Sequence, residues 1–136
     1  MTGIIVTGHG NYADGIMSAI ELVAGVPEQV QAVNFKKGES VDELRAHMIE
    51  AVQALESSDV ILLVDILGGS PFNVAAQLLA EDMKKNLKVV AGANMAAVIQ
   101  AVFMREAVAF DQLAAEVSRA GKEGIVDISA MMDASM

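Results

Sequence analysis

The sequence predicts a single doubly wound α/β domain over residues 1–136, with a mostly parallel sheet covered by helices on both faces. Strand-like and helix-like hydrophobic patterns alternate from one end of the chain to the other. Val60–Val64 is an uninterrupted apolar run, which is typical of a parallel strand buried on both faces. A length of 136 residues suits one domain with one core.

The first half of the chain predicts two strand–helix units. Apolar side chains at three- and four-residue steps indicate a helix that stops at Gly25, where Pro27 follows. Ser40 and Glu43 form a capping-box pattern at the start of a second amphipathic helix. The predicted strands here are Gly3–Thr7 and Val30–Phe35.

The second half continues the alternation, with Ser70 suited to the N-cap and Pro71 to the first position of a helix reaching about Met83. Further predicted elements are a strand over Lys88–Ala91, helices over Ala96–Arg105 and Phe110–Ala120, and a short strand over Ile125–Ile128. Too little chain remains after that strand for another crossover helix. We therefore expect it to pair antiparallel at a sheet edge or to reach a neighbouring subunit.

Composition restricts the classes of partner. Hydrophobic residues make up 54% of the chain, which favours burial of some apolar surface against a second copy. The formal net charge of −9 argues against nucleic acid and anionic membranes, and favours a basic protein surface. Cysteine is absent, which excludes disulfides and thiol chemistry and fits a reducing cytoplasm. No basic, apolar leader is visible and the apolar runs are too short for a membrane span, so we expect a cytoplasmic protein.

Three polar residues fall where predicted strands end or helices begin: His9, Asp65 and Ser70. If the first and third strands are neighbours, Asp65 lies beside His9 at the carboxyl edge of the sheet. A carboxylate that accepts the Nδ1 proton leaves the Nε2 lone pair free, which suits a nucleophile for a phosphoryl group. Ser70 and the amides around Gly68 and Gly69 would supply donors to the anion.

Plainer roles exist for each of these residues. Asp65 would also close a strand or cap a turn, Ser70 would serve only as an N-cap, and the glycines would serve only a tight turn. His47 lies among charged neighbours at the edge of an apolar helical stripe and is interpreted as a solvated residue.

Other site classes fit the residues less well. A dinucleotide site would need an acidic residue after the second strand, where Asn34 and Lys36 flank Phe35. A receiver-type aspartate would need acidic magnesium ligands after the first strand, which are missing. A small Ser-His-Asp hydrolase stays a minority alternative, since Phe72 replaces the last glycine of a nucleophile elbow. One histidine and one aspartate are too few ligands for a metal site.

Three blocks together resemble the IIA component of the mannose/fructose/sorbose family of the phosphoenolpyruvate-dependent sugar phosphotransferase system. The blocks are Thr7–Gly10, Val64–Asn73 and Val90–Met95, and the resemblance covers essentially the whole chain in order and spacing. It implies that His9 is the phosphoryl acceptor, through Nε2, that Asp65 orients it, and that Ser70 corresponds to the serine after the double glycine. Gly10, Gly68 and Gly69 are the further candidates for binding the phosphoryl group.

The resemblance also implies the partners and the assembly. The donor would be the histidine-phosphorylated carrier protein HPr, and the acceptor a IIB component that serves the membrane IIC/IID complex. The sheet order would be 2-1-3-4 and the chain a homodimer with its last strand exchanged, without a metal or other cofactor. A phosphotransfer subunit of dihydroxyacetone kinase and a pure interaction module remain the alternatives. The chain looks like a free-standing IIA, although a piece of a IIAB fusion would look the same, and the sugar is not indicated.

Overall fold

The computed structural model describes residues 1–135 and shows a four-stranded sheet between two layers of helices. The strands are β1 (Gly3–His9), β2 (Val30–Phe35), β3 (Asp59–Val64) and β4 (Asn86–Ala91). They pair in the order β2-β1-β3-β4, and every pairing is parallel. The predicted fold class and strand order are thereby confirmed.

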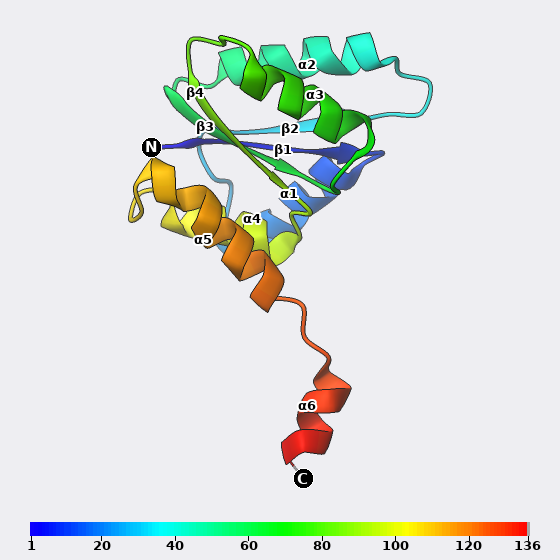
Figure 1. Cartoon of the computed structure of the whole chain (residues 1–136), viewed down its shortest axis with the longest axis vertical. Coiled ribbons are helices and arrows are strands. Elements are labelled where there is room, and N and C mark those ends of the chain that lie inside the picture. The colour runs from blue at the N-terminus through cyan, green and yellow to red at the C-terminus, as the bar shows by residue number, and fades with distance from the viewer. Residues whose placement is uncertain (136) are drawn as a thin grey trace.

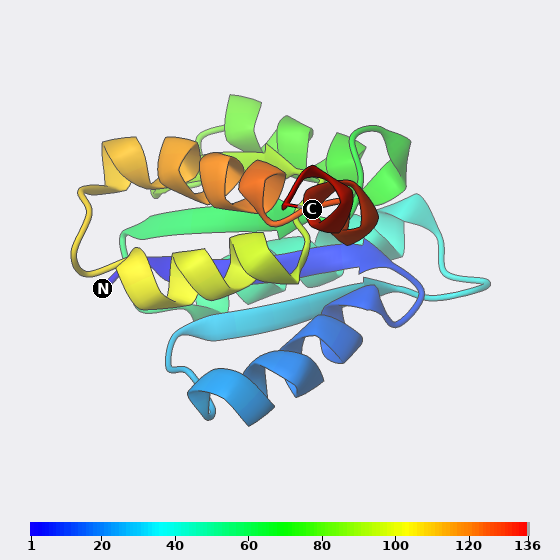
Figure 2. The same cartoon turned by 90° about the horizontal axis from the view of Figure 1, so that it is seen from below.

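The helices divide between the two faces of the sheet, as Figures 1 and 2 show. On one face lie α2 (Val41–Ala54) and α3 (Gly69–Ala80), and on the other lie α1 (Tyr12–Ala24), α4 (Met95–Met104) and α5 (Phe110–Glu123). Side chains alternate along β1, so that Ile5 faces the α2–α3 layer while Ile4 and Val6 face the α1–α4–α5 layer. All three are fully buried, which gives the domain a separate core on each side of the sheet.

Local signals in the sequence set several helix ends. Ser40 and Glu43 form both hydrogen bonds of the predicted capping box at the start of α2. Gly25 is the C-cap of α1, where its φ of 72° suits glycine. At the other end of α2, the Lys85 ammonium donates to the carbonyls of Val52 and of the C-cap residue Leu55, in the last turn, where helix carbonyls lack their usual partners.

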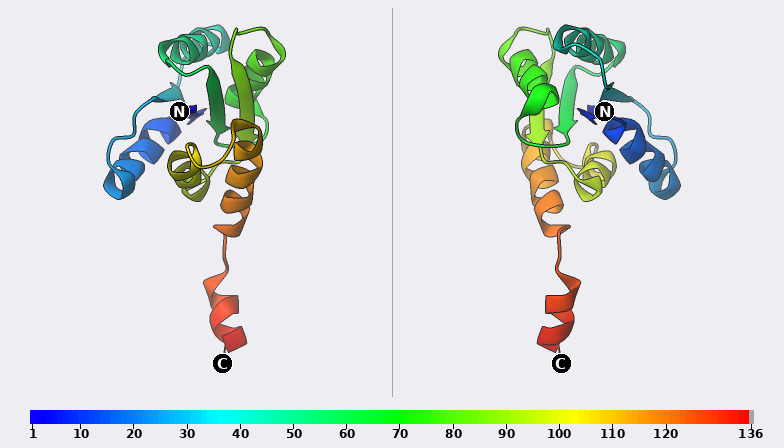
Figure 3. Two further views of the ribbon diagram at one scale, coloured as in Figure 1. Left: turned by 90° about the vertical axis from the view of Figure 1, so that its left-hand side faces the viewer. Right: turned by 90° about the vertical axis from the view of Figure 1, so that its right-hand side faces the viewer.

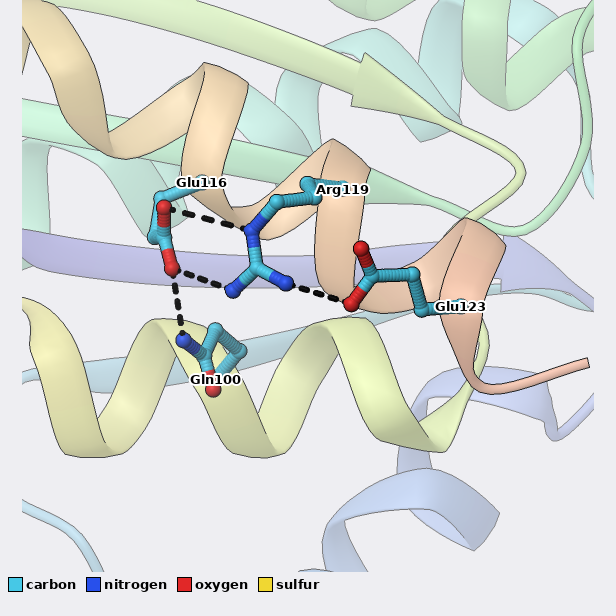
Figure 4. Close-up of polar contacts among 4 residues, drawn as sticks. All are labelled: Gln100, Glu116, Arg119 and Glu123. Atoms are coloured by element: carbon cyan, nitrogen blue, oxygen red, sulfur yellow. Dashed lines mark hydrogen bonds and ion pairs between the residues drawn. The ribbon is translucent and has the colours of Figure 1, made fainter.

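Long-range polar contacts tie the helical layer on the α1–α4–α5 side together. The buried Arg105 guanidinium at the end of α4 donates to the Thr2 carbonyl just before β1, at 3.2 Å. Figure 4 shows the contact between α4 and α5, where Gln100 donates to Glu116 and Arg119 donates to Glu116 and Glu123. The Arg119 hydrogen bond holds the pKa of Glu116 below its ordinary value.

The predicted C-terminal strand does not form within the single chain, and its exchange with a second subunit stays a prediction. Residues 125–127 form no regular element, and α6 (Ile128–Ser135) follows them and projects from the domain, as Figures 1 and 3 show. The Asp127 carboxylate accepts from the Ala130 amide at 3.1 Å, which is an N-cap interaction. β-branched residues favour a strand only where another strand supplies hydrogen bonds. In the single chain, residues 125–128 do not lie beside any strand of the sheet.

Candidate functional site

The site begins at the carboxyl end of β1, where His9 is the last residue of the strand. Gly10 follows with a φ of 58°, and its amide donates to the Phe35 carbonyl at 2.8 Å. This left-handed residue turns the chain away from the sheet before α1 starts at Tyr12. The His9 side chain is 49% exposed and stands edge-to-face with the Phe35 ring, with the centroids 6.2 Å apart.

Asp65 follows β3 directly and meets His9 across the parallel pair. Its Oδ2 accepts from the His9 amide at 2.9 Å and lies 2.8 Å from Nδ1 of the same residue. Its Oδ1 accepts from the Ile66 amide at 2.9 Å, and its own amide donates to the Thr7 carbonyl at 3.1 Å. A carboxylate only accepts, so this geometry assigns the proton to Nδ1 and leaves the Nε2 lone pair free.

The first turn of α3 lies against the free side of the imidazole. A Cβ built on Gly69 would lie 2.9 Å from Cε1 and 3.1 Å from Nε2 of His9, so only glycine allows this approach. Gly68 and Gly69 both have positive φ, at 88° and 83°. Since the first amides of a helix have no partner within the helix, α3 presents donors and the positive end of its dipole close to Nε2.

The predicted N-cap role of Ser70 is wrong, and Pro71 is not at the first position of the helix. Gly68 is the N-cap of α3 and the helix begins at Gly69, one residue before Ser70, because the two positive-φ glycines already complete the turn out of β3. Ser70 therefore lies inside the first turn, and its hydroxyl makes no hydrogen bond to any of residues 1–135. That hydroxyl is free to bind a ligand beside the helix N-terminus.

Comparison with known proteins gives the family. A protein-family model described as "PTS system fructose IIA component" matches residues 3–118. The chain belongs to this family. It is 32% identical to the fructose-specific EIIA component of Bacillus subtilis, over 83% of this chain and 77% of that protein. It is also 32% identical to the mannose-specific EIIAB component of Escherichia coli, over 96% of this chain but only 41% of that protein.

Solved structures agree with this membership. The chain superposes on an EIIA component from Streptococcus agalactiae with a TM-score of 0.89 and 38% identity, over 96% of this chain and 99% of that one. The resemblance inferred from the sequence is thus confirmed, and the chain is a component for phosphotransfer in sugar uptake. None of the helices within residues 1–135 combines the length and apolarity that a membrane span requires.

Two neighbours of the site were missed from the sequence. A Cβ on Gly8 would lie 2.6 Å from Tyr12 Cδ1 and 2.7 Å from Asp65 Cγ, so Gly8 makes room for both side chains. The Tyr12 hydroxyl donates to the Ala93 carbonyl, which follows β4. Burial raises the pKa of Tyr12 above 10.0, and the charge of Asp65 raises it further. The Gly8 position directly before His9 was the available signal, since a strand residue without Cβ marks a close approach.

Other candidate residues lie apart from His9 or have other partners. His47 pairs with Glu39 at 2.9 Å on the exposed side of α2, in agreement with its interpretation as a solvated residue. Ser70 is not hydrogen-bonded to His9, so the nucleophile–base contact of a hydrolase triad is missing from residues 1–135. Within the same residues, no group of three or more His, Cys, Asp or Glu is arranged to hold a metal.

Proposed function

We propose that His9 accepts a phosphoryl group from the carrier protein HPr through Nε2 and passes it to a IIB component. The observation that carries this proposal is the pair of contacts on the two sides of the imidazole. Asp65 engages Nδ1 at 2.8 Å, while the first turn of α3 lies against Nε2. One nitrogen is thereby fixed as a donor, and the other is left as a nucleophile beside anion-binding amides.

The transfer is an exchange between two nitrogen atoms. The Nε2 lone pair of His9 forms a bond to phosphorus, while the bond from phosphorus to the donor's histidine nitrogen breaks and its electron pair stays on that nitrogen. The Nδ1 proton of His9 stays on Nδ1, where its hydrogen bond to Asp65 stabilises the positive charge that develops on the ring. The step to the IIB histidine is the same exchange with His9 as the leaving group. Positioning and charge stabilisation are the main requirements of such a reaction.

The phosphoryl oxygens gain their hydrogen bonds from the start of α3. The amides of Gly69 and Ser70, with the Ser70 hydroxyl, are the donors on this side of Nε2. Gly68 supports them as the N-cap of the helix. The Gly10 amide already donates to Phe35, so its contribution is the positive-φ turn after His9.

The exposure of His9 fits a protein donor and a protein acceptor. Its side chain is 49% exposed at the edge of the sheet, and Ile66 and Leu67 beside it are apolar and more than half exposed. A cavity of about 830 Å³, lined by Thr2, Arg105 and others, opens at the opposite end of the sheet. An open surface with apolar flanks lets two carrier proteins approach Nε2 in turn, and the sugar itself meets only the membrane IIC/IID complex. We include in the proposal a homodimer joined through the C-terminal segment.

Intact-mass analysis tests the assignment. The protein is incubated with phosphoenolpyruvate, enzyme I and HPr, and we expect an acid-labile gain of one phosphoryl group. The gain disappears in His9→Ala and persists in His47→Ala, which removes the second of the chain's two histidines. Adding a IIB component then discharges the phosphorylated protein. A gain that persists in His9→Ala, or no gain while HPr itself is phosphorylated, would contradict the proposal.

A further inference from the structure

Tyr12 lies beside the His9–Asp65 pair and contacts segments on both sides of it. It is the first residue of α1 and is half-buried. Its hydroxyl donates to the carbonyl of Ala93, which is 81 residues away in the sequence. Tyr12 therefore connects the turn after β1 to the loop after β4.

The same loop is tied to Asp65 by the backbone. The Ala93 amide donates to the Val64 carbonyl at 2.8 Å, and Val64 directly precedes Asp65. The Asp65 amide in turn donates to Thr7, two residues before His9. These hydrogen bonds, joined by the covalent backbone, connect Tyr12 through Ala93 and the end of β3 back to β1. The Tyr12 side chain therefore restrains the loop after β4 and, through it, the end of β3.

The ring of Tyr12 also lies next to the Asp65 side chain, beside Gly8. Both side chains fill the room left open by Gly8, with Tyr12 Cδ1 and Asp65 Cγ within 2.7 Å of the point where a Cβ would lie. With the ring in place, the Asp65 side chain has little freedom to move away from His9. Asp65 is itself only 13% exposed, so solvent does not offer it an alternative position.

We propose that Tyr12 is a positioning residue for phosphoryl transfer: its ring and hydroxyl hold Asp65 in the orientation that keeps the proton of His9 on Nδ1. This inference rests on the proposed function for its kinetic consequence, and on geometry alone for its effect on the imidazole. Burial, and to a lesser extent the charge of Asp65, raises the pKa of Tyr12 above its ordinary value, which keeps the hydroxyl able to donate.

The test uses the full-length protein with Tyr12→Phe, which removes only the hydroxyl, and Tyr12→Leu, which also removes the ring. The control is Phe110→Leu, because Phe110 packs against the same core from the opposite end of the sheet. ¹⁵N NMR of the His9 ring, recorded on the unphosphorylated protein, reports which nitrogen carries the proton. Phosphorylation by HPr is measured in parallel, with kcat and KM determined separately.

We expect Tyr12→Phe to lower kcat about three- to tenfold with little change in KM, as for the loss of one hydrogen bond. Tyr12→Leu lowers kcat further and gives a mixture of Nδ1–H and Nε2–H tautomers, whereas wild type and Phe110→Leu remain Nδ1–H. A wild-type tautomer and kcat in both Tyr12 variants would overturn the inference. If Tyr12→Leu does not fold, unchanged values in Tyr12→Phe overturn it alone. Failure of HPr to phosphorylate wild type would instead overturn the proposed function, and the tautomer would still decide the role of Tyr12.

Discussion

Replacing Gly69 with alanine tests the close approach between α3 and His9. The new Cβ would lie 2.9 Å from Cε1 and 3.1 Å from Nε2, whereas ordinary contacts begin at 3.4 Å. The imidazole or the helix start must therefore shift by about half an ångström. Because a displacement of about 1 Å at a reacting centre can cost about 100-fold in rate, we expect phosphorylation by HPr to slow on the order of tenfold.

Backbone strain has to be separated from this steric effect. Gly69 has a φ of 83°, and an alanine there costs about 1–2 kcal/mol of stability from the left-handed conformation alone. Gly25→Ala is the matched control, since Gly25 has a φ of 72°, lies at the end of α1, and has no atom within 4 Å of a built Cβ. Urea unfolding monitored by circular dichroism gives the stability of both variants.

We expect the two variants to lose similar stability, while only Gly69→Ala loses phosphorylation rate. Rates are taken from the acid-labile mass gain at short times under identical HPr concentrations. Equal rates in Gly69→Ala and wild type would show that the α3 start does not confine the Nε2 side of His9, and the reasoning from the glycine contact would be refuted.

Three further predictions concern the surroundings of His9. Asp65→Asn should slow phosphoryl transfer about tenfold without unfolding the protein. A hydrogen bond to a charged group contributes about 1.5–3 kcal/mol, and the half-exposed His9 ring favours the lower value. Unchanged single-turnover rates would remove Asp65 from the mechanism. Thr7→Val should raise the free energy of unfolding in urea by about 1 kcal/mol, because the buried Thr7 hydroxyl has no hydrogen-bond partner within residues 1–135. A loss of stability would mean that the hydroxyl is hydrogen-bonded. Alkaline titration of the absorbance of Tyr12, the chain's single tyrosine, should give a midpoint above 10.0 that falls in Asp65→Asn. Because the pKa of Tyr12 is raised on folding, the protonated hydroxyl adds to the free energy of unfolding below pH 10.0, and this contribution is lost as the pH rises through the folded pKa. Tyr12→Phe should not show this loss of stability at alkaline pH.

The sequence alone determined the class of fold and indicated the two principal residues of the candidate site. Val60–Val64 indicated a strand covered on both faces, because a continuous apolar run is stable only where both faces are buried. Ser40 with Glu43 showed where α2 begins, because the capping box is formed by residues three apart in the chain. His9 and Asp65 lie at the carboxyl ends of two strands that pair in parallel, so their positions predicted that the two side chains lie close together. These features follow from local pattern and from the common edge of a parallel sheet.

Tertiary structure decided what depends on segments far apart in the sequence. The Tyr12 hydroxyl bonds to Ala93, which lies far away in the sequence, so no local pattern indicates this contact. Gly8 marks a close approach in the sequence, but only the structure shows that Tyr12 and Asp65 fill the space beside it. Serine is a residue type that favours the N-cap, but the positive-φ conformations of Gly68 and Gly69 let α3 begin one residue before Ser70. Ile125–Ile128 has the composition of a strand, yet strand hydrogen bonds require a neighbouring strand, and in the single chain Asp127 caps a helix instead.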